Sequence, residues 1–115
     1  MKFENANVLI TGGASGIGKI MGRMALERGA KRFIIWDINL AGIEQTRKEL
    51  SSYGKVKGYV VNVADNNVVT AAYRKTVEDC GPIDILINCA GIVTSNKTFD
   101  QQTTEEIVRT MNINA

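Results

Sequence analysis

Histidine is absent from this chain of 115 residues, and proline and cysteine are scarce. The two cysteines, Cys80 and Cys89, fit neither a zinc-binding nor a C-x-x-C spacing, so we expect no metal site. We interpret both as reduced thiols, consistent with a cytoplasmic protein. With a single proline, the chain has no sign of long linkers, and its length suits one domain or part of one.

The charge shows no strong excess of either sign. Lysine and arginine number 14 against 12 acidic residues, and no basic cluster occurs, so the sequence does not indicate a nucleic-acid partner. Residues 1–5 carry charged side chains at Lys2 and Glu4 and lead straight into a predicted strand, which is unlike a signal peptide. No apolar run approaches membrane-spanning length, so we expect no membrane partner.

Glycine is plentiful, and much of it lies in residues 11–18. This stretch follows the apolar residues 8–10 and precedes a helical pattern. A helix start offers unpaired N–H groups and a positive dipole end, which suit a phosphate if the backbone can come close. Glycine permits that approach because it has no Cβ. The stretch is not the usual G-x-G-x-x-G pattern, because Met21 stands where that pattern needs its third glycine. The alternative interpretation is a merely flexible glycine-rich loop.

The order Thr-Gly-x-x-x-Gly-x-Gly resembles the short-chain dehydrogenase/reductase family, which binds NAD or NADP. The resemblance implies that Gly12 makes the tight turn and that Gly16 lets the backbone reach the phosphates. It also implies that Gly18 lets the helix lie close to the strand. The cofactor-binding residues expected in this stretch are Thr11, Gly12, Ser15, Gly16, Ile17 and Gly18.

An acidic residue, Asp37, ends the next apolar run, about 20 residues after the glycines. A carboxylate there can accept hydrogen bonds from both ribose hydroxyls and would repel a 2′-phosphate. No lysine or arginine lies between Gly12 and Gly18, where NADP-preferring relatives often carry one. We therefore expect NAD as the cofactor, with NADP less favoured. Ile38, which follows Asp37, is also expected to be a cofactor-binding residue. The alternative role for Asp37 is a cap for the following helix.

Two later segments match the family in part. Relatives usually have Asp-Val or Asp-Leu beside the adenine ring, where this chain has Asn62 and Val63. The amide oxygen of Asn62 can still accept a hydrogen bond from the adenine amino group. The segment Asn-Cys-Ala-Gly resembles the family signature Asn-Asn-Ala-Gly, so Asn88, Ala90 and Gly91 are expected near the nicotinamide ribose. Asn88 would tie the strand end to its neighbour, while Cys89 suits a small buried apolar residue.

Apolar runs and helical periodicities alternate along the chain. We expect strands at 6–11, 32–37, 56–63 and 83–87, and helices at 17–28, 40–50 and 67–80. In the first helix the apolar spacing predicts a buried face of Ile17, Ile20, Met21 and Met24. Right-handed crossovers give the strand order 3-2-1-4. The predicted fold class is α/β, the N-terminal portion of a Rossmann-like doubly wound parallel sheet in three layers.

A last helix is expected to begin at Thr103, which forms a capping box with Glu106, and to continue to the end of the chain. The resemblance implies that Asn114 on this helix holds a water linked to the catalytic lysine. An ordinary surface amide is the alternative. Relatives pair through this helix, so we expect a homodimer or homotetramer.

The catalytic pair of the family is Tyr-x-x-x-Lys, and Tyr53 and Lys57 match it literally. We reject this match because Gly54 and the strand that follows separate the two residues from a common helix. The family's catalytic serine, tyrosine and lysine come after a fifth strand, so this chain corresponds to about the first half of the family's fold. Residues 1–115 are thus expected to be the N-terminal part of one dinucleotide-binding domain, inactive alone.

The favoured function is an oxidoreductase that interconverts a secondary alcohol and a carbonyl with NAD, this chain supplying the cofactor-binding half. The residues around Trp36 and Val60 look most like the branch that acts on steroids, retinoids and other lipid-like alcohols. The alternative is a non-catalytic NAD-binding fragment or regulatory module. A methyltransferase fits less well, because this chain lacks the G-x-G-x-G loop of such enzymes and the Asn-Cys-Ala-Gly segment would be left unexplained.

Overall fold

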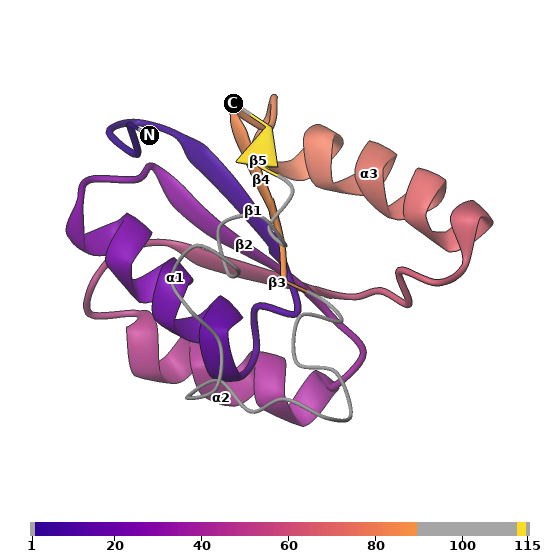
Figure 1. Cartoon of the computed structure of the whole chain (residues 1–115), viewed down its shortest axis with the longest axis horizontal. Helices are drawn as coiled ribbons and strands as arrows, with labels where there is room; N and C mark the ends of the chain where they lie inside the picture. Colours follow the sequence, from indigo (N-terminus) through magenta and orange to yellow (C-terminus); the bar gives the residue numbers. More distant parts are fainter. Residues whose placement is uncertain (1, 90–112, 115) are drawn as a thin grey trace.

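The computed structural model describes residues 2–89 and 113–114, which form one sheet with helices on both faces (Figure 1). The order of strands in the sheet is β3-β2-β1-β4-β5, and the pairs among the first four strands are parallel. The predicted order 3-2-1-4 is therefore confirmed. The elements are β1 (Asn7–Thr11), α1 (Gly16–Glu27), β2 (Arg32–Asp37), α2 (Leu40–Leu50), β3 (Val56–Val60), α3 (Asn66–Cys80), β4 (Ile85–Asn88) and β5 (Ile113–Asn114).

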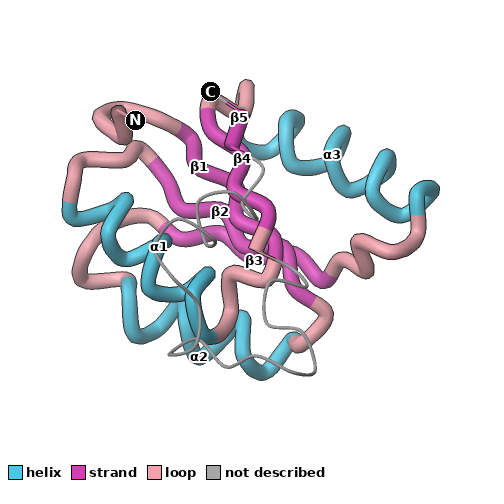
Figure 2. The backbone as a smooth tube through the Cα atoms, viewed as in Figure 1, coloured by secondary structure: helices cyan, strands magenta, loops and turns pink. Residues whose placement is uncertain are grey.

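Each face of the sheet has its own core. Val8 and Ile10 of β1 pack in the cluster that includes residues of α1 and α2, whereas Leu9 between them joins the cluster beside α3. Side chains alternate between the two faces of a strand, so a strand buried on both faces must be apolar at every position. Figure 2 shows α1 and α2 together on one side of the sheet and α3 on the other. This three-layer arrangement explains the unbroken apolar runs of the sequence.

The buried face of α1 differs in part from the prediction, because Ile17 is buried and Met21 packs against the core as expected, whereas Ile20 does not. Ile20 is 52% exposed, and the buried residues of the helix include the small residues Gly18, Gly22 and Ala25. A Cβ on Gly22 would collide with the ring of Phe33, which lies in β2. The helix therefore approaches the sheet so closely that small residues form its contact face, and a larger apolar residue beside them faces solvent.

The last strand is a second difference. The sequence pattern predicts a helix through residues 113 and 114, but the structure places Ile113–Asn114 in β5, antiparallel to β4. The outer edge of β4 presents backbone N–H and C=O groups that a strand can pair. Isoleucine, being β-branched, favours extended backbone. The rest of the predicted helix lies outside the described residues.

A polar network joins the amino ends of the strands to the end of α3. The side-chain amide of Asn7 donates to the backbone oxygens of Cys80 and Pro82, both at 2.9 Å. Arg32 donates to the same Cys80 oxygen at 2.9 Å and to Asn7. Asp84 in turn accepts from the backbone N–H of Asn7 at 2.7 Å. The cation and the amide satisfy carbonyl oxygens at the negative end of the helix dipole.

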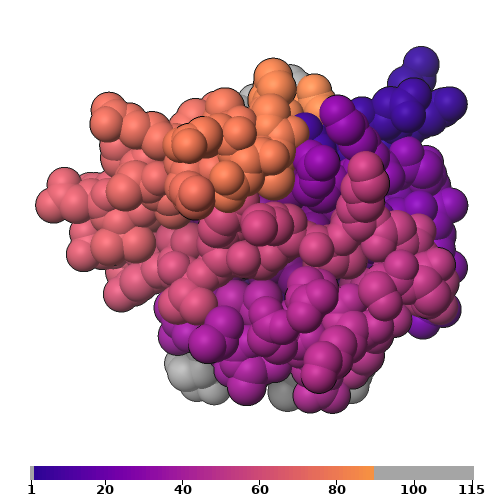
Figure 3. All heavy atoms as spheres, turned by 180° about the vertical axis from the view of Figure 1, so that it is seen from behind, coloured from indigo at the N-terminus to yellow at the C-terminus, as the bar shows by residue number. Residues whose placement is uncertain are grey.

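Helix α3 is held to the sheet mainly through its second half. Trp36 donates through its indole nitrogen to Thr76 at 3.1 Å, and Tyr59 donates to Asp79 at 2.8 Å. Asp65 caps the helix start as predicted, accepting from the backbone N–H groups of Asn67 and Val68. In Figure 3 the atoms of α3 and of the residues that follow it form one side of the rear face.

Candidate functional site

The carboxyl ends of four parallel strands lie along one edge of the sheet, and each carries a polar residue. Thr11 ends β1, Asp37 ends β2 and Asn88 ends β4, while Asn62 comes two residues after β3. Ligands of open α/β sheets bind at this edge, beside the strand where the winding changes direction. Here that strand is β1, because β2 and β4 flank it. These four sequence-predicted residues are thus brought to the same edge of the sheet.

The glycine loop connects β1 to α1, and the backbone N–H groups of Gly12 and Ala14 donate to residues at the end of β2. Gly12 adopts a φ of 71° and donates its N–H to the oxygen of Trp36 at 2.7 Å. Ser15 is the N-cap residue of α1 and makes no side-chain cap bond, and the first turn has no acidic residue. Gly16 has a φ of 54°, and nothing lies within 4 Å of the position that a Cβ would take. This open helix start is suited to a phosphate group.

Gly18 and Ile17 contribute to the loop in another way. A Cβ on Gly18 would lie 2.8 Å from the carbonyl carbon of Gly12 and 2.9 Å from the Cα of Gly13. The side chain of Ile17 is buried in the core, so only its backbone can meet a ligand. Gly18 therefore sets the close packing of α1 on the loop.

Asp37 is attached to the glycine loop by its carboxylate. One oxygen accepts the N–H of Ala14 and the other accepts the N–H of Asn39, both at 3.1 Å. The N-cap of α2 is Asn39, whose side chain accepts from Gly42, so the helix-cap role considered for Asp37 is wrong. Each carboxylate oxygen keeps a further lone pair that can accept a ligand hydroxyl.

Two residues that sequence reasoning missed hold this arrangement. The backbone N–H of Ala14 links the loop to Asp37. The backbone oxygen of Ala14 accepts a hydrogen bond, 3.1 Å long, from the hydroxyl of Thr46 in α2. Thr46 is 1% exposed and stands three residues after Ile43, on the buried side of α2. A polar residue on an apolar helix face was the signal that could have found it, since a buried hydroxyl needs a partner.

A cavity of about 280 Å³ opens next to Asp37. Its walls are mostly apolar, and its polar side chains at the rim are those of Asp37 and Asn62. Ile38 and Val63, both predicted as cofactor-binding residues, line it and are 71% and 38% exposed. The lining residues are Gly12, Trp36, Asp37, Ile38, Val61, Asn62, Val63 and Ala64. An apolar slot with a carboxylate at its edge suits a flat base attached to a ribose.

Asn88 joins β4 to β1 at the other side of the glycine loop, as the sequence predicts. Its side-chain oxygen accepts the hydroxyl of Thr11, and the N–H of Cys89 donates to the oxygen of Thr11 at 3.1 Å. The predicted site residues Ala90 and Gly91 lie outside the described residues. For Asn114 the structure gives a backbone place only, in β5 opposite Leu86.

Burial raises the pKa of the Cys89 thiol to about 11. We therefore expect slow alkylation of Cys89 by iodoacetamide at pH 8 and a rate that rises until about pH 11, because the thiolate is the reacting form. Mass spectrometry of the modified peptide over a pH series measures this, with the urea-unfolded chain as the control. The folded chain holds this proton more tightly than the unfolded chain, so the associated stability is present below about pH 9 and is lost toward pH 11. Equal rates in the folded and unfolded chains at pH 8 would contradict the assignment.

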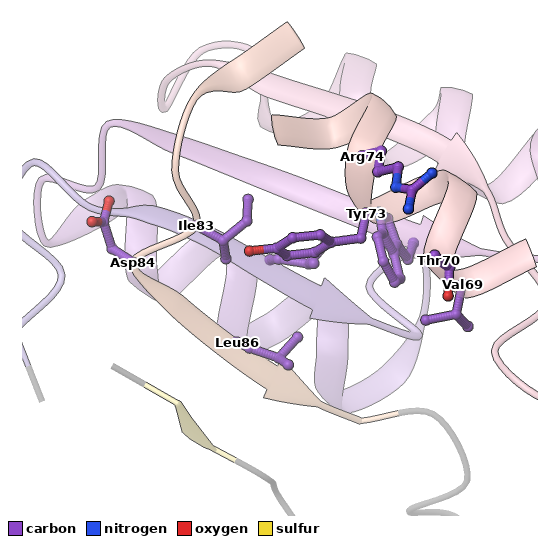
Figure 4. A pocket seen from close by; sticks show the side chains of 9 residues that line it. Val69, Thr70, Tyr73, Arg74, Ile83, Asp84 and Leu86 are labelled. Carbon is purple, nitrogen blue, oxygen red and sulfur yellow. The ribbon is translucent and has the colours of Figure 1, made fainter. Parts of the chain in front are cut away.

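A second cavity lies on the face of the sheet beside α3. It measures about 420 Å³, and no residue of the glycine loop lines it. Figure 4 shows the ring of Tyr73 reaching from α3 toward Ile83, with Leu86 of β4 nearby. We place the candidate site at the smaller cavity, since size alone does not supply convergent polar groups.

The literal Tyr-x-x-x-Lys match is not a catalytic pair in the structure. Tyr53 lies in the turn after α2 with Arg23 over its ring at 4.9 Å, and Lys57 lies in β3 with the ring of Tyr59 at 5.7 Å. Within the described part of the chain, no cluster of three acidic or cysteine side chains could hold a metal ion. None of the described helices is long and apolar enough to cross a membrane.

Comparison with known proteins shows which family this chain is similar to. The family model described as short chain dehydrogenase matches residues 6–115. The 3-oxoacyl-(acyl-carrier-protein) reductase of Thermotoga maritima is 40% identical over 93 residues, which are 80% of this chain and 37% of that protein. Estradiol 17-beta-dehydrogenase 11 of Rattus norvegicus is 34% identical over 108 residues, 93% of this chain and 36% of that protein. The chain thus spans little more than a third of the length of these relatives.

Solved structures with a similar fold include two that were determined with a dinucleotide bound. An L-sorbose reductase from Gluconobacter frateurii, solved with NADPH and L-sorbose, has a TM-score of 0.71 and 25% identity, covering 92% of this chain and 41% of that one. A xylitol dehydrogenase solved with NAD⁺ has a TM-score of 0.70 and 25% identity, covering 75% of this chain and 33% of that one. The fold therefore occurs in proteins solved with either dinucleotide.

Proposed function

Because this chain belongs to the short chain dehydrogenase family, we propose that it forms the NAD-binding part of an oxidoreductase that interconverts a secondary alcohol and a carbonyl compound. Residues 6–115 are the part matched by the family model. In this proposal residues 1–115 are the N-terminal part of one dinucleotide-binding domain, and the residues for proton transfer come from elsewhere in the protein.

The observation that carries the proposal is the position of Asp37. Its carboxylate is held at the carboxyl end of β2 by the N–H groups of Ala14 and Asn39, and it lines the 280 Å³ cavity. The open helix start at Ser15 and Gly16 lies in the same loop as Ala14. A dinucleotide needs these features together: donors for the pyrophosphate, an acceptor for the ribose and an apolar slot for the base.

Each group has a separate part to play. The backbone N–H groups of the α1 start would bind the pyrophosphate, and Gly16 would leave room for it. Asp37 would accept the ribose hydroxyls and exclude a 2′-phosphate by charge repulsion. Asn88 keeps the end of β4 against Thr11, on the side of β1 away from the base cavity. When bound, a nicotinamide cofactor supplies the hydride donor or acceptor.

The substrate class is the broader part of the proposal. The similar proteins include one named for a 3-oxoacyl-(acyl-carrier-protein) substrate and one named for estradiol, so a hydroxyl or carbonyl group is the chemistry that they share. We propose a homodimer or homotetramer for the whole protein, with Asn114 near its catalytic centre. A regulatory NAD-binding module without catalysis is the second candidate, because none of the described residues supplies a tyrosine and lysine pair.

Calorimetric titration of the chain with NAD and with NADP tests the proposal. We expect NAD to bind at least about tenfold more tightly, since that ratio corresponds to only about 1.4 kcal/mol of repulsion at the ribose. S-adenosylmethionine serves as the comparison ligand for a methyltransferase. Binding of neither dinucleotide, or tighter binding of S-adenosylmethionine, would refute the proposed function.

A further inference from the structure

The side chain of Asn62 is held in one orientation by its own turn. Its amide oxygen accepts the backbone N–H of Ala64 at 3.0 Å, and its backbone oxygen accepts the N–H of Asp65 at 3.1 Å. A backbone N–H can only be met by an acceptor, so the oxygen of the amide faces Ala64. The NH₂ group of Asn62 is consequently on the other side of the amide, away from the turn.

Asn62 is also placed to meet the base of a dinucleotide. It lines the cavity that carries Asp37, and among the residues lining that cavity these two have the polar side chains available at the rim. The indole nitrogen of Trp36, also in the lining, already donates to Thr76. With Asp37 assigned to the ribose, the amide of Asn62 remains for the edge of the base.

We propose that Asn62 selects the base, and that it lets the site accept a 6-oxopurine as well as a 6-aminopurine. The inference rests on the proposed function. The NH₂ group can donate to the oxygen of a 6-oxopurine, while the second lone pair of the amide oxygen can accept from a 6-amino group. A carboxylate in the same turn would offer acceptors only. It would bind the amino group and repel the oxo group.

The test compares two dinucleotides that differ at position 6 of the purine: NAD and nicotinamide hypoxanthine dinucleotide. The 115-residue chain is titrated with each by calorimetry. We expect the two dissociation constants to lie within about threefold of each other, since a comparable hydrogen bond is available to each base. Asn62→Asp keeps the size of the side chain and the acceptor for Ala64, and we expect it to favour NAD by about tenfold or more.

Asn66→Asp is the matched control. Asn66 begins α3, is exposed and does not line the cavity, so the substitution adds the same charge without changing the group at the base. We expect it to leave the ratio of the two dissociation constants unchanged. Using a ratio removes any general effect of added negative charge on dinucleotide binding.

The outcomes separate this inference from the proposed function. NAD binding combined with a strong preference for NAD in the unchanged chain would overturn the inference alone, as would an unchanged ratio in Asn62→Asp. Binding of neither dinucleotide would overturn the proposed function, and the inference with it. A ratio near one that shifts toward NAD only in Asn62→Asp supports both.

Discussion

Replacement of Gly18 by alanine is expected to lower the free energy of unfolding by about 3 kcal/mol, at the upper end of the usual penalty for overpacking. The added Cβ would lie 2.8 Å from the carbonyl carbon of Gly12 and 2.9 Å from the Cα of Gly13. Both atoms belong to the backbone, so no side chain can turn aside to relieve the contact. Urea denaturation followed by circular dichroism measures the loss, and NAD affinity is expected to fall with it because the loop must shift.

Gly16→Ala is the matched control, with the opposite balance of effects. Nothing lies within 4 Å of the position its Cβ would take, so the only penalty to folding is the left-handed backbone with a φ of 54°. That penalty is about 1 kcal/mol. The methyl group would still project from the open helix start, so NAD binding is expected to weaken with little loss of stability. An equal loss of stability in both variants would contradict the assignment of a packing role to Gly18 alone.

Substitution of Asp37 by alanine is expected to shift the ratio of NAD affinity to NADP affinity by about a hundredfold toward NADP. Two unit charges about 4 Å apart repel by roughly 4 kcal/mol at an effective dielectric of 20. The half-exposed position of Asp37 allows solvent to reduce that figure. Titration of the variant with both dinucleotides measures the shift.

Asp37→Asn separates charge from loop support. The asparagine oxygen can still accept the N–H of Ala14, which the alanine variant leaves without its partner. If repulsion governs the preference, NADP binding strengthens in the asparagine variant as well. If Asp37 mainly supports the loop, both dinucleotides bind more weakly to the alanine variant, and asparagine restores them together without changing their ratio.

The sequence predicted the sheet well because its signals are local and redundant. An apolar run buried on both faces, a glycine loop and the acidic residue at the end of β2 each point to the same parallel arrangement. The cap of α3 was also predicted, because Asp65 precedes the helical pattern and its carboxylate caps the helix start. The link from Asn88 to the neighbouring strand, which the family resemblance implied, is also present in the structure.

The failures concern spacing between elements, which a single segment does not encode. Periodicity placed Ile20 in the buried face of α1, but the closeness of Phe33 to Gly22 decides which residues face the sheet. Likewise, the pairing of Ile113–Asn114 with β4 depends on an edge that is only present once the sheet has formed. The turn of Asn62 onto Ala64 was within reach of the sequence, since asparagine commonly bonds the backbone two residues ahead.

The central place of β1 has a consequence for the order of folding. Its partner on one side, β2, is near in the chain, whereas Thr11 and Asn88 are 77 positions apart. Closing the longer loop loses more chain entropy and slows the search for that contact. We therefore expect the unit from β1 to β3, with α1 and α2, to form before β4 docks. On this expectation the loop and carboxylate of the proposed pyrophosphate and ribose site assemble before the strand end at Asn88 arrives.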